Sequence, residues 1–172
     1  MPITMPMNIK AAYQFYSRFI LDADKARVLA EHGFSVNGTV APSVWECLGA
    51  VLYGKRKQAG YGADLGDVEV KSVAAGSSGV EYQYHKESGL EKLRHDMTID
   101  HLFLFYGNEY KSLDSYLVKG VSLAPTMREW LAKLEGWYDN PCHQRFRCSI
   151  KSRFVRANGK RILTIEDGKL LS

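Results

Sequence analysis

The sequence has little of what marks secreted, membrane-spanning or zinc-binding proteins. Its three cysteines are an odd number with no CxxC spacing, so we expect neither a disulfide framework nor a zinc site. No uninterrupted apolar stretch approaches the roughly 20 residues that a membrane-spanning helix needs. The first six residues lack a basic region followed by an apolar core, so no signal peptide is expected. These absences favour a cytoplasmic protein without a membrane partner.

The chain also lacks internal repeats and any Pro/Gly/Ser-rich segment long enough to separate two domains. Its length of 172 residues favours one domain. The hydrophobic content of 45% and the charged content of 24% exclude a disordered or collagen-like chain. We expect a single domain over residues 1–172, with an N-terminal helical part at 8–57, a central core at 43–106 and basic strands at 142–172.

Acidic residues are missing from a long segment near the end of the sequence. None occurs between residues 142 and 165. Residues 142–172 together carry a net charge of +6, whereas the rest of the chain sums to −2. Segregated charge of this kind indicates a polyanionic partner for one region of the protein.

Basic and apolar residues alternate at the start of this segment. One face of a strand would carry Arg145, Arg147, Ser149, Lys151 and Arg153. The other face would be largely apolar, with Phe146, Cys148, Ile150, Ser152 and Phe154. This pattern favours a strand that packs on the core through one face and contacts phosphates or base edges of a nucleic acid through the other. A basic face that is only solvated is the alternative.

Hydrophobic spacing predicts an α/β (α+β) fold. Helical periodicity is present at about 9–32, from 43 to 55–57, at 88–96 and at 126–138. Alternation or continuous apolar runs predict strands at 67–73, 80–86, 99–106 and from 145 onward, with Asn158 and Gly159 as a two-residue hairpin turn. We therefore expect a central mixed β-sheet flanked by helices.

The residues best suited to chemistry lie at 62–72. In a strand, Asp67, Glu69 and Lys71 share one face, and two neighbouring carboxylates repel each other unless a cation lies between them. Asp64 lies just upstream, where a bend at Gly66 could bring it beside Glu69. Clustered oxygen ligands suit Mg²⁺. The alternative is an exposed strand whose charges discourage edge pairing.

The segment Asp64-x4-Glu69-Val70-Lys71 resembles the active-site signature of the PD-(D/E)XK nucleases, a superfamily that includes most type II restriction endonucleases. Their core runs helix, three-stranded meander, helix, strand, and the predicted order over 43–106, about a third of the chain, is similar to it. The resemblance implies a restriction-endonuclease-like core. Ala63 stands where the signature has Pro, and the short spacing to Glu69 leaves either Asp64 or Asp67 as the first ligand. We expect Asp64.

By this resemblance, the protein is a Mg²⁺-dependent type II site-specific deoxyribonuclease that cuts double-stranded DNA at a short sequence. Asp64, Glu69 and the main-chain carbonyl of Val70 would hold one or two metal ions. Lys71 would orient the attacking water or help to deprotonate it. A metal ion generates hydroxide near neutral pH and offsets the charge that develops on the phosphate. Because one small chain carries one site, cutting both strands most simply requires a homodimer.

Four further side chains have two possible roles each. Glu46 could face the metal site or close a capping box on Ser43. Gln83 and His85 share one face of the next strand, where they could reach the DNA or form a surface polar pair. His101 lies inside an apolar run, so we expect a buried structural histidine rather than a catalyst.

Two other functions are compatible with the same residues. One is a repair, phage, homing or nicking endonuclease of the same fold. The other is a non-catalytic nucleic-acid-binding protein that has kept the fold, although such a protein has no use for the trio of Asp64, Glu69 and Lys71.

Overall fold

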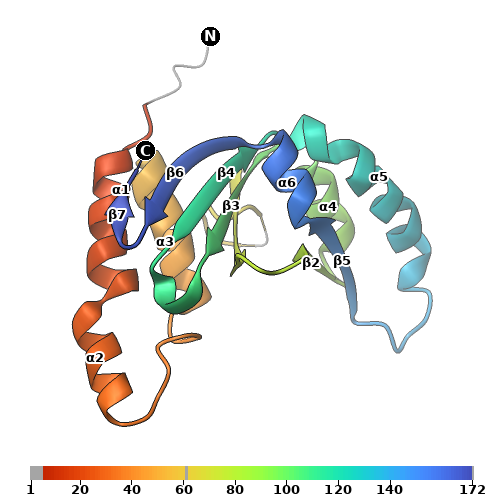
Figure 1. The fold of residues 1–172 in the computed structure, drawn as a ribbon. Helices are drawn as coiled ribbons and strands as arrows, with labels where there is room; N and C mark the ends of the chain where they lie inside the picture. The colour runs from red at the N-terminus through yellow and green to blue at the C-terminus, as the bar shows by residue number, and fades with distance from the viewer. Residues whose placement is uncertain (1–5, 61, 172) are drawn as a thin grey trace.

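The structure, a computed structural model, describes residues 6–60 and 62–171. Residues 1–5, most of the segment that argued against a signal peptide, lie outside the described residues, as do Tyr61 and Ser172. Figure 1 shows a sheet in the middle of the molecule with helices on both sides. No helix in the part of the chain that the structure describes is long and apolar enough to cross a membrane.

The central sheet has five strands in the order β1-β3-β4-β6-β7. They are β1 (Val68–Ala74), β3 (Asp100–Tyr106), β4 (Leu113–Val118), β6 (Lys160–Glu166) and β7 (Lys169–Leu170). β1 runs parallel to β3, and the other neighbours pair antiparallel. Two further strands, β2 (Gly79–His85) and β5 (Arg145–Lys151), form a separate antiparallel ribbon. The prediction of a mixed central sheet flanked by helices is confirmed.

Helices cover both faces of this sheet. One face carries α1 (Ile9–Phe15), the π-helical turn η1 (Tyr16–Leu21), α2 (Ala23–Glu31) and α3 (Pro42–Tyr53). The β2–β5 ribbon lies on the other face with α4 (Gly89–Asp96), α5 (Gly120–Trp137) and α6 (Ser152–Asn158). The 3-10 turn η2 (Asn108–Tyr110) connects β3 to β4.

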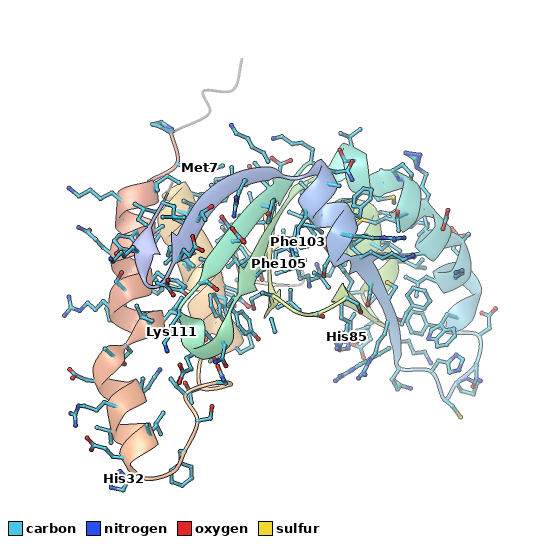
Figure 2. The ribbon with its side chains drawn as sticks, viewed as in Figure 1. Met7, His32, His85, Phe103, Phe105 and Lys111 are labelled. Atoms are coloured by element: carbon cyan, nitrogen blue, oxygen red, sulfur yellow. The ribbon has the colours of Figure 1, made fainter. Side chains whose placement is uncertain are left out.

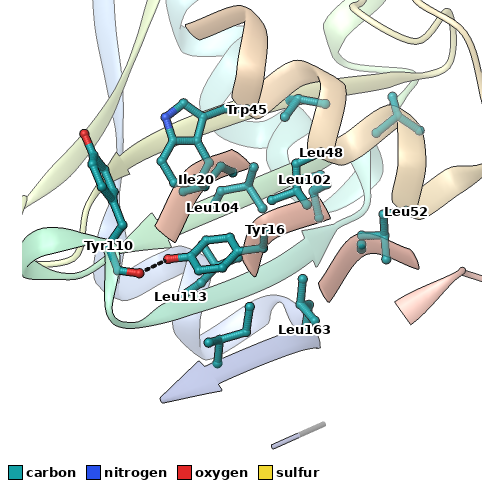
Figure 3. Packing of buried hydrophobic residues seen from close by; sticks show 14 of the residues in the cluster. Tyr16, Ile20, Trp45, Leu48, Leu52, Leu102, Leu104, Tyr110, Leu113 and Leu163 are labelled. Atoms are coloured by element: carbon teal, nitrogen blue, oxygen red, sulfur yellow. Dashed lines mark hydrogen bonds between the residues drawn. The ribbon is translucent and has the colours of Figure 1, made fainter. Parts of the chain in front are cut away.

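Alternation along β3 divides the interior into two cores. Leu102 and Leu104 point into the first core with α1, η1 and α3, where Tyr16 donates a hydrogen bond to the Tyr110 carbonyl (Figure 3). Phe103 and Phe105 point into the second core with the ribbon, α4, α5 and α6. β3 is thus buried on both faces, as its apolar run predicted.

The helix predicted at 9–32 is divided into three pieces. Asp22, between η1 and α2, has a φ of 33°, a left-handed conformation that interrupts the helix. Its carboxylate accepts a hydrogen bond from the Lys25 amide and so caps α2. Apolar periodicity continues through the break, which is why the sequence did not reveal it.

α5 starts at Gly120, six residues before the helix predicted from position 126, and contains Pro125. Gly120 lies so close to the main chain of Ile99 that an added Cβ would collide with it. Leu123 and Ala124 are buried. Burial of this first turn therefore outweighs the hydrogen bond that Pro125 removes.

Two predictions for the C-terminal segment are wrong. The strand from Arg145 ends at Lys151, so Arg153 lies on helix α6 instead of the predicted strand. Asn158 and Gly159 do not form a hairpin turn. The strands on either side of α6, β5 and β6, belong to different sheets, and the chain crosses between them as a helix.

The region between α3 and α4 has two strands where the resemblance implied a three-stranded meander. An isolated bridge between Ala63 and Gly66 precedes β1. β2 does not pair with β1 but leaves the sheet to pair with β5. The strand that completes the sheet, β4, was not predicted, because its alternation is interrupted by Asp114 and Ser115.

Candidate active site

A cleft of about 480 Å³ lies where β1 passes between α3 and β2. Four residues of the predicted motif line it: Asp64, Glu69, Val70 and Lys71. α3 contributes Glu46 beside Pro42 and Trp45, Ser72 follows the motif on β1, and β2 contributes Glu81 and Gln83. Side chains from three separate elements therefore converge on the motif.

The alternation of β1 produces this arrangement. Val68 and Val70 pack in the first core, and Gly49 of α3 lies against Val70 so closely that a Cβ there would collide with it. Glu69 and Lys71 therefore point to the opposite face of the strand. There Glu69 is 4% exposed, although it is charged.

Asp64 is held beside Glu69 by a turn. Gly66, at a φ of +85°, supplies the left-handed residue of that turn. The Val70 amide donates a hydrogen bond of 2.9 Å to Asp64 Oδ2. Burial and the nearby charge of Glu69 raise the pKa of Asp64 to about 6, against the weaker opposing effect of that hydrogen bond. The two carboxylates, which line the same cleft, therefore repel each other.

Asp67, the other candidate for the first metal ligand, lies elsewhere. Its side chain is 69% exposed and forms an ion pair with Lys55. It does not line the cleft. The geometry thus favours Asp64 over Asp67.

The two ammonium groups beside Glu69 contact the same oxygen of its carboxylate. Its Oε1 atom lies 3.1 Å from Lys71 Nζ and 3.3 Å from Lys92 Nζ. Its Oε2 atom is buried and has no hydrogen-bond partner among the residues that the structure describes. Burial raises the pKa of Glu69, but the two lysines outweigh it, so the pKa is lowered overall. Glu69 is therefore an ionised carboxylate with one free oxygen.

Glu46 does not close a capping box. α3 begins at Pro42, its N-cap is Ala41, and no side chain caps it. Glu46 lines the cleft instead, and its Oε2 atom accepts a hydrogen bond of 2.7 Å from Lys57. The position agrees with the first of its two possible roles.

The donor set fits a hard divalent cation. Asp64 and Glu69 are the two carboxylates of the motif, and both line the cleft. Among the described residues the buried Oε2 atom of Glu69 has no partner, and a cation would supply one. In the described ranges, no three His, Cys, Asp or Glu side chains are grouped closely enough to hold a metal by themselves. Mg²⁺ suits such a site because it keeps several waters and needs only one or two protein carboxylates.

Gln83 and His85 occupy one face of β2, as predicted, but only Gln83 reaches the cleft. His85 is exposed at the end of the ribbon, away from Phe103 and Phe105 (Figure 2). The opposite face of β2 carries Tyr82 and Tyr84, which are buried.

Three of the predicted basic residues lie on the outer face of β5. Arg145, Arg147 and Lys151 are exposed, while Phe146 and Ile150 are buried beneath them. The strand pairing places Arg147 opposite Gln83 and Arg145 opposite His85. Arg147 therefore lies next to Gln83, a residue that lines the cleft.

His101 is a buried structural histidine, as expected. It is 0% exposed, and its Nε2 atom lies 2.7 Å from the Asp96 carbonyl. Because a carbonyl only accepts, Nε2 carries the proton and Nδ1 accepts the hydrogen bond from the Tyr82 hydroxyl, at 2.8 Å. Burial lowers the pKa of His101, which keeps the ring neutral.

Sequence reasoning missed Lys92 and Asp96. They are four residues apart on α4, a spacing that suggests an ion pair on a helix. Nothing in the sequence indicates that Lys92 also reaches Glu69, 23 positions earlier. That contact depends on how α4 packs against β2 and α5.

The chain was compared with known proteins. Neither a protein-family model nor a curated protein matches it.

Proposed function

We propose that the protein is a Mg²⁺-dependent endonuclease with a restriction-endonuclease-like core, which hydrolyses phosphodiester bonds of double-stranded DNA at a short specific sequence. One observation carries the proposal. Asp64, Glu69 and Lys71 line a single cleft in which one carboxylate oxygen is buried without a partner. A site built only for binding gains nothing from that arrangement, because an unpaired buried oxygen costs free energy.

Each residue of the cleft has a role in such a reaction. Asp64, Glu69 and the Val70 carbonyl would hold the cation, which supplies a hydroxide near neutral pH and offsets charge on the phosphate. Lys71 can donate hydrogen bonds to the attacking water or to a phosphate oxygen. Gln83, on the opposite wall of the cleft, can contact the phosphate or a base edge.

The β2–β5 ribbon supports DNA as the substrate. Its outer face carries Arg145, Arg147 and Lys151, which can contact phosphates or guanine edges. Arg147 lies opposite Gln83 across the two strands. A duplex bound along this face would therefore reach the cleft without a break in contact.

The assembly and setting follow from the proposed reaction. One chain has one such cleft, so cleavage of both strands would require a homodimer whose two-fold axis matches that of a symmetric DNA site. The three cysteines are free, as is usual in the cytoplasm, where a restriction enzyme would meet foreign DNA.

A plasmid-nicking assay with and without Mg²⁺ tests the proposal. Wild-type protein should convert supercoiled plasmid of mixed sequence into discrete linear fragments only when Mg²⁺ is present. Glu69→Gln should be inactive, whereas Glu129→Gln, a matched change at an exposed position of α5, should cleave as the wild type does.

The other outcomes identify the competing functions. A smear of products indicates a non-specific repair or phage nuclease of the same fold, and nicks alone indicate a nicking endonuclease. Retarded but intact plasmid indicates a non-catalytic nucleic-acid-binding protein and overturns the proposal.

A further inference from the structure

Glu69 has two ammonium partners, and they are held very differently. Lys71 Nζ has Glu69 as its carboxylate partner and otherwise lies 4.6 Å above the ring of Tyr82. Lys92 Nζ lies between two carboxylates, 3.3 Å from Glu69 Oε1 and 3.1 Å from Asp96 Oδ1. Lys92 is therefore the more firmly anchored of the two.

The anchor of Lys92 is itself fixed. Asp96 is 0% exposed, and its Oδ2 atom accepts a hydrogen bond of 2.9 Å from the Tyr84 hydroxyl. Its main-chain carbonyl accepts from His101, which in turn is bonded to Tyr82. β2, through Tyr84, and β3, through His101, thus hold Asp96 from two sides, and Asp96 holds the lysine.

Stability alone does not explain why Glu69, Lys92 and Asp96 are buried as charged groups. An ion pair taken out of water gains little net stability, because the loss of hydration is nearly as large as the attraction. Lys92 lies between two carboxylates, those of Glu69 and Asp96, which favour its ammonium form. It is therefore a permanent positive charge beside Glu69.

We propose that Lys92 is a positioning residue of the active site, which acts as the standing counter-ion of Glu69. By holding Oε1, it leaves Oε2 directed toward the cation. It also allows the Lys71 ammonium to leave Glu69 and turn to the water or phosphate without exposing an unpaired buried carboxylate. This inference rests on the proposed function.

The arrangement has a distinctive consequence. A positive charge next to a metal-binding carboxylate weakens cation binding by direct repulsion. Loss of Lys92 should therefore strengthen cation binding while it slows cleavage, because Lys71 is then retained by Glu69. If Lys92 had a merely structural role, its substitution would either weaken cation binding and slow cleavage together or leave both unchanged.

The experiment measures the two quantities separately in the full chain. Mn²⁺ binding is followed by the electron paramagnetic resonance signal of the free ion, and cleavage by single-turnover rates at saturating Mg²⁺. Lys92→Met should bind Mn²⁺ more tightly, by about 10-fold or more, since about 10-fold is the Coulomb effect of a unit charge on a divalent ion about 6 Å away even in water. Its cleavage rate should fall by about 10²-fold, the cost of a misplaced catalytic group.

Three further variants complete the design. Lys92→Met leaves the buried Asp96 without its ammonium partner, which can prevent folding. The double variant Lys92→Met with Asp96→Asn removes both charges and should show the same opposed changes. Lys92→Arg keeps the charge and should restore most of the rate. Lys10→Met, an exposed change on α1, is the matched control.

The outcomes separate the two proposals. Wild-type protein that binds Mn²⁺ but cuts no DNA overturns the proposed function alone. If the wild type is active, and Lys92→Met and the double variant both cut DNA and bind Mn²⁺ as the wild type does, only the role of Lys92 is overturned. Joint loss of rate and Mn²⁺ affinity in the folded double variant also overturns that role, and absence of Mn²⁺ binding in the wild type overturns both.

Discussion

The two faces of β3 differ in what they bury. The first face, with Leu102 and Leu104, meets a core of aliphatic and aromatic side chains from α1, η1 and α3. The second face, with Phe103 and Phe105, also meets aliphatic and aromatic side chains, but a polar chain of hydrogen bonds and ion pairs lies among them. That chain runs from Tyr84 through Asp96 and Lys92 to Glu69.

This difference separates stability from function within one sheet. Apolar burial on the first face supplies free energy of folding in proportion to the area removed from water. Ionised groups buried on the second face contribute little net stability, but they contact Glu69, a buried carboxylate of the cleft. We therefore expect substitutions on the two faces to have different effects, and the predictions below test this from the largest effect to the smallest.

The largest expected effect is loss of cleavage on removal of a metal-binding carboxylate. Asp64→Asn should abolish Mg²⁺-dependent cleavage while leaving DNA binding in place, because the side chain lies in the cleft beside Glu69. Asp67→Asn should have a small effect, since that side chain points to solvent and pairs with Lys55. The measurement is cleavage and DNA retardation for both variants; the reverse ranking would assign the first ligand to Asp67.

The next effect concerns the chemical step. Lys71→Ala removes an ammonium that lies 3.1 Å from Glu69 and lines the cleft. Single-turnover cleavage should slow by about 10²–10⁴-fold, the range for a positioned proton-transfer group. The free energy of unfolding should change little, since Lys92 still compensates Glu69. A rate within tenfold of wild type would show that Lys71 is not catalytic.

The apolar face should show the opposite behaviour. Leu104 is fully buried in the first core, so Leu104→Ala should lower the free energy of unfolding by about 2–5 kcal/mol in a denaturant titration. Its cleavage rate, measured at a temperature where the variant is folded, should remain close to wild type. A large loss of activity in the folded variant would mean that the two faces are not separable.

The parts of this organisation that follow local periodicity were predictable. Alternation at 67–73 placed Glu69 and Lys71 on one face, and the structure has them there. The apolar run at 99–106 predicted a strand buried on both sides, which is β3. Such patterns depend only on the side-chain period of a strand, so a single sequence reveals them.

The parts that depend on distant contacts were not predictable. α6 replaces an expected turn because β5 and β6 lie in different sheets. Ser115 of β4 looks unsuited to a central strand, but its hydroxyl bonds to the main chain of Leu163. Lys92 reaches Glu69 only because α4 packs against β2 and α5. The sequence around each of these residues does not indicate which distant residues it contacts.

A smaller effect should appear in the pH dependence of stability. The pKa of Asp64 is raised to about 6, mainly by burial and by Glu69. A group whose pKa is raised on folding stabilises the fold fully below its unfolded value near 4, and that contribution is lost as the pH rises through about 6. At pH 7 the ionised carboxylate therefore destabilises the metal-free fold.

Asp64→Asn should consequently be the more stable protein at pH 7 without metal, by about 1 kcal/mol once the partial exposure of the group is discounted. The difference should vanish below pH 4, where Asp64 is neutral in both the folded and unfolded states. Thermal unfolding from pH 3.5 to 8 in the presence of a chelator measures it. Equal stability across the whole range would mean that the two carboxylates do not repel each other in solution.

The smallest effect tests the outer face of the ribbon that covers the second core. If Arg147 contacts a phosphate, log–log plots of DNA affinity against salt should flatten by about one unit in Arg147→Ala, equally for cognate and random duplexes. If it reads guanine, the variant should lose about 1–3 kcal/mol at one base position with the slope nearly unchanged. Arg27→Ala, on α2, is the matched control. The face is only a solvated surface if three single variants all bind DNA as the wild type does: Arg145→Ala, Arg147→Ala and Lys151→Ala. The DNA contacts would then have to come from Lys55, Arg56 and Lys57 beside the cleft.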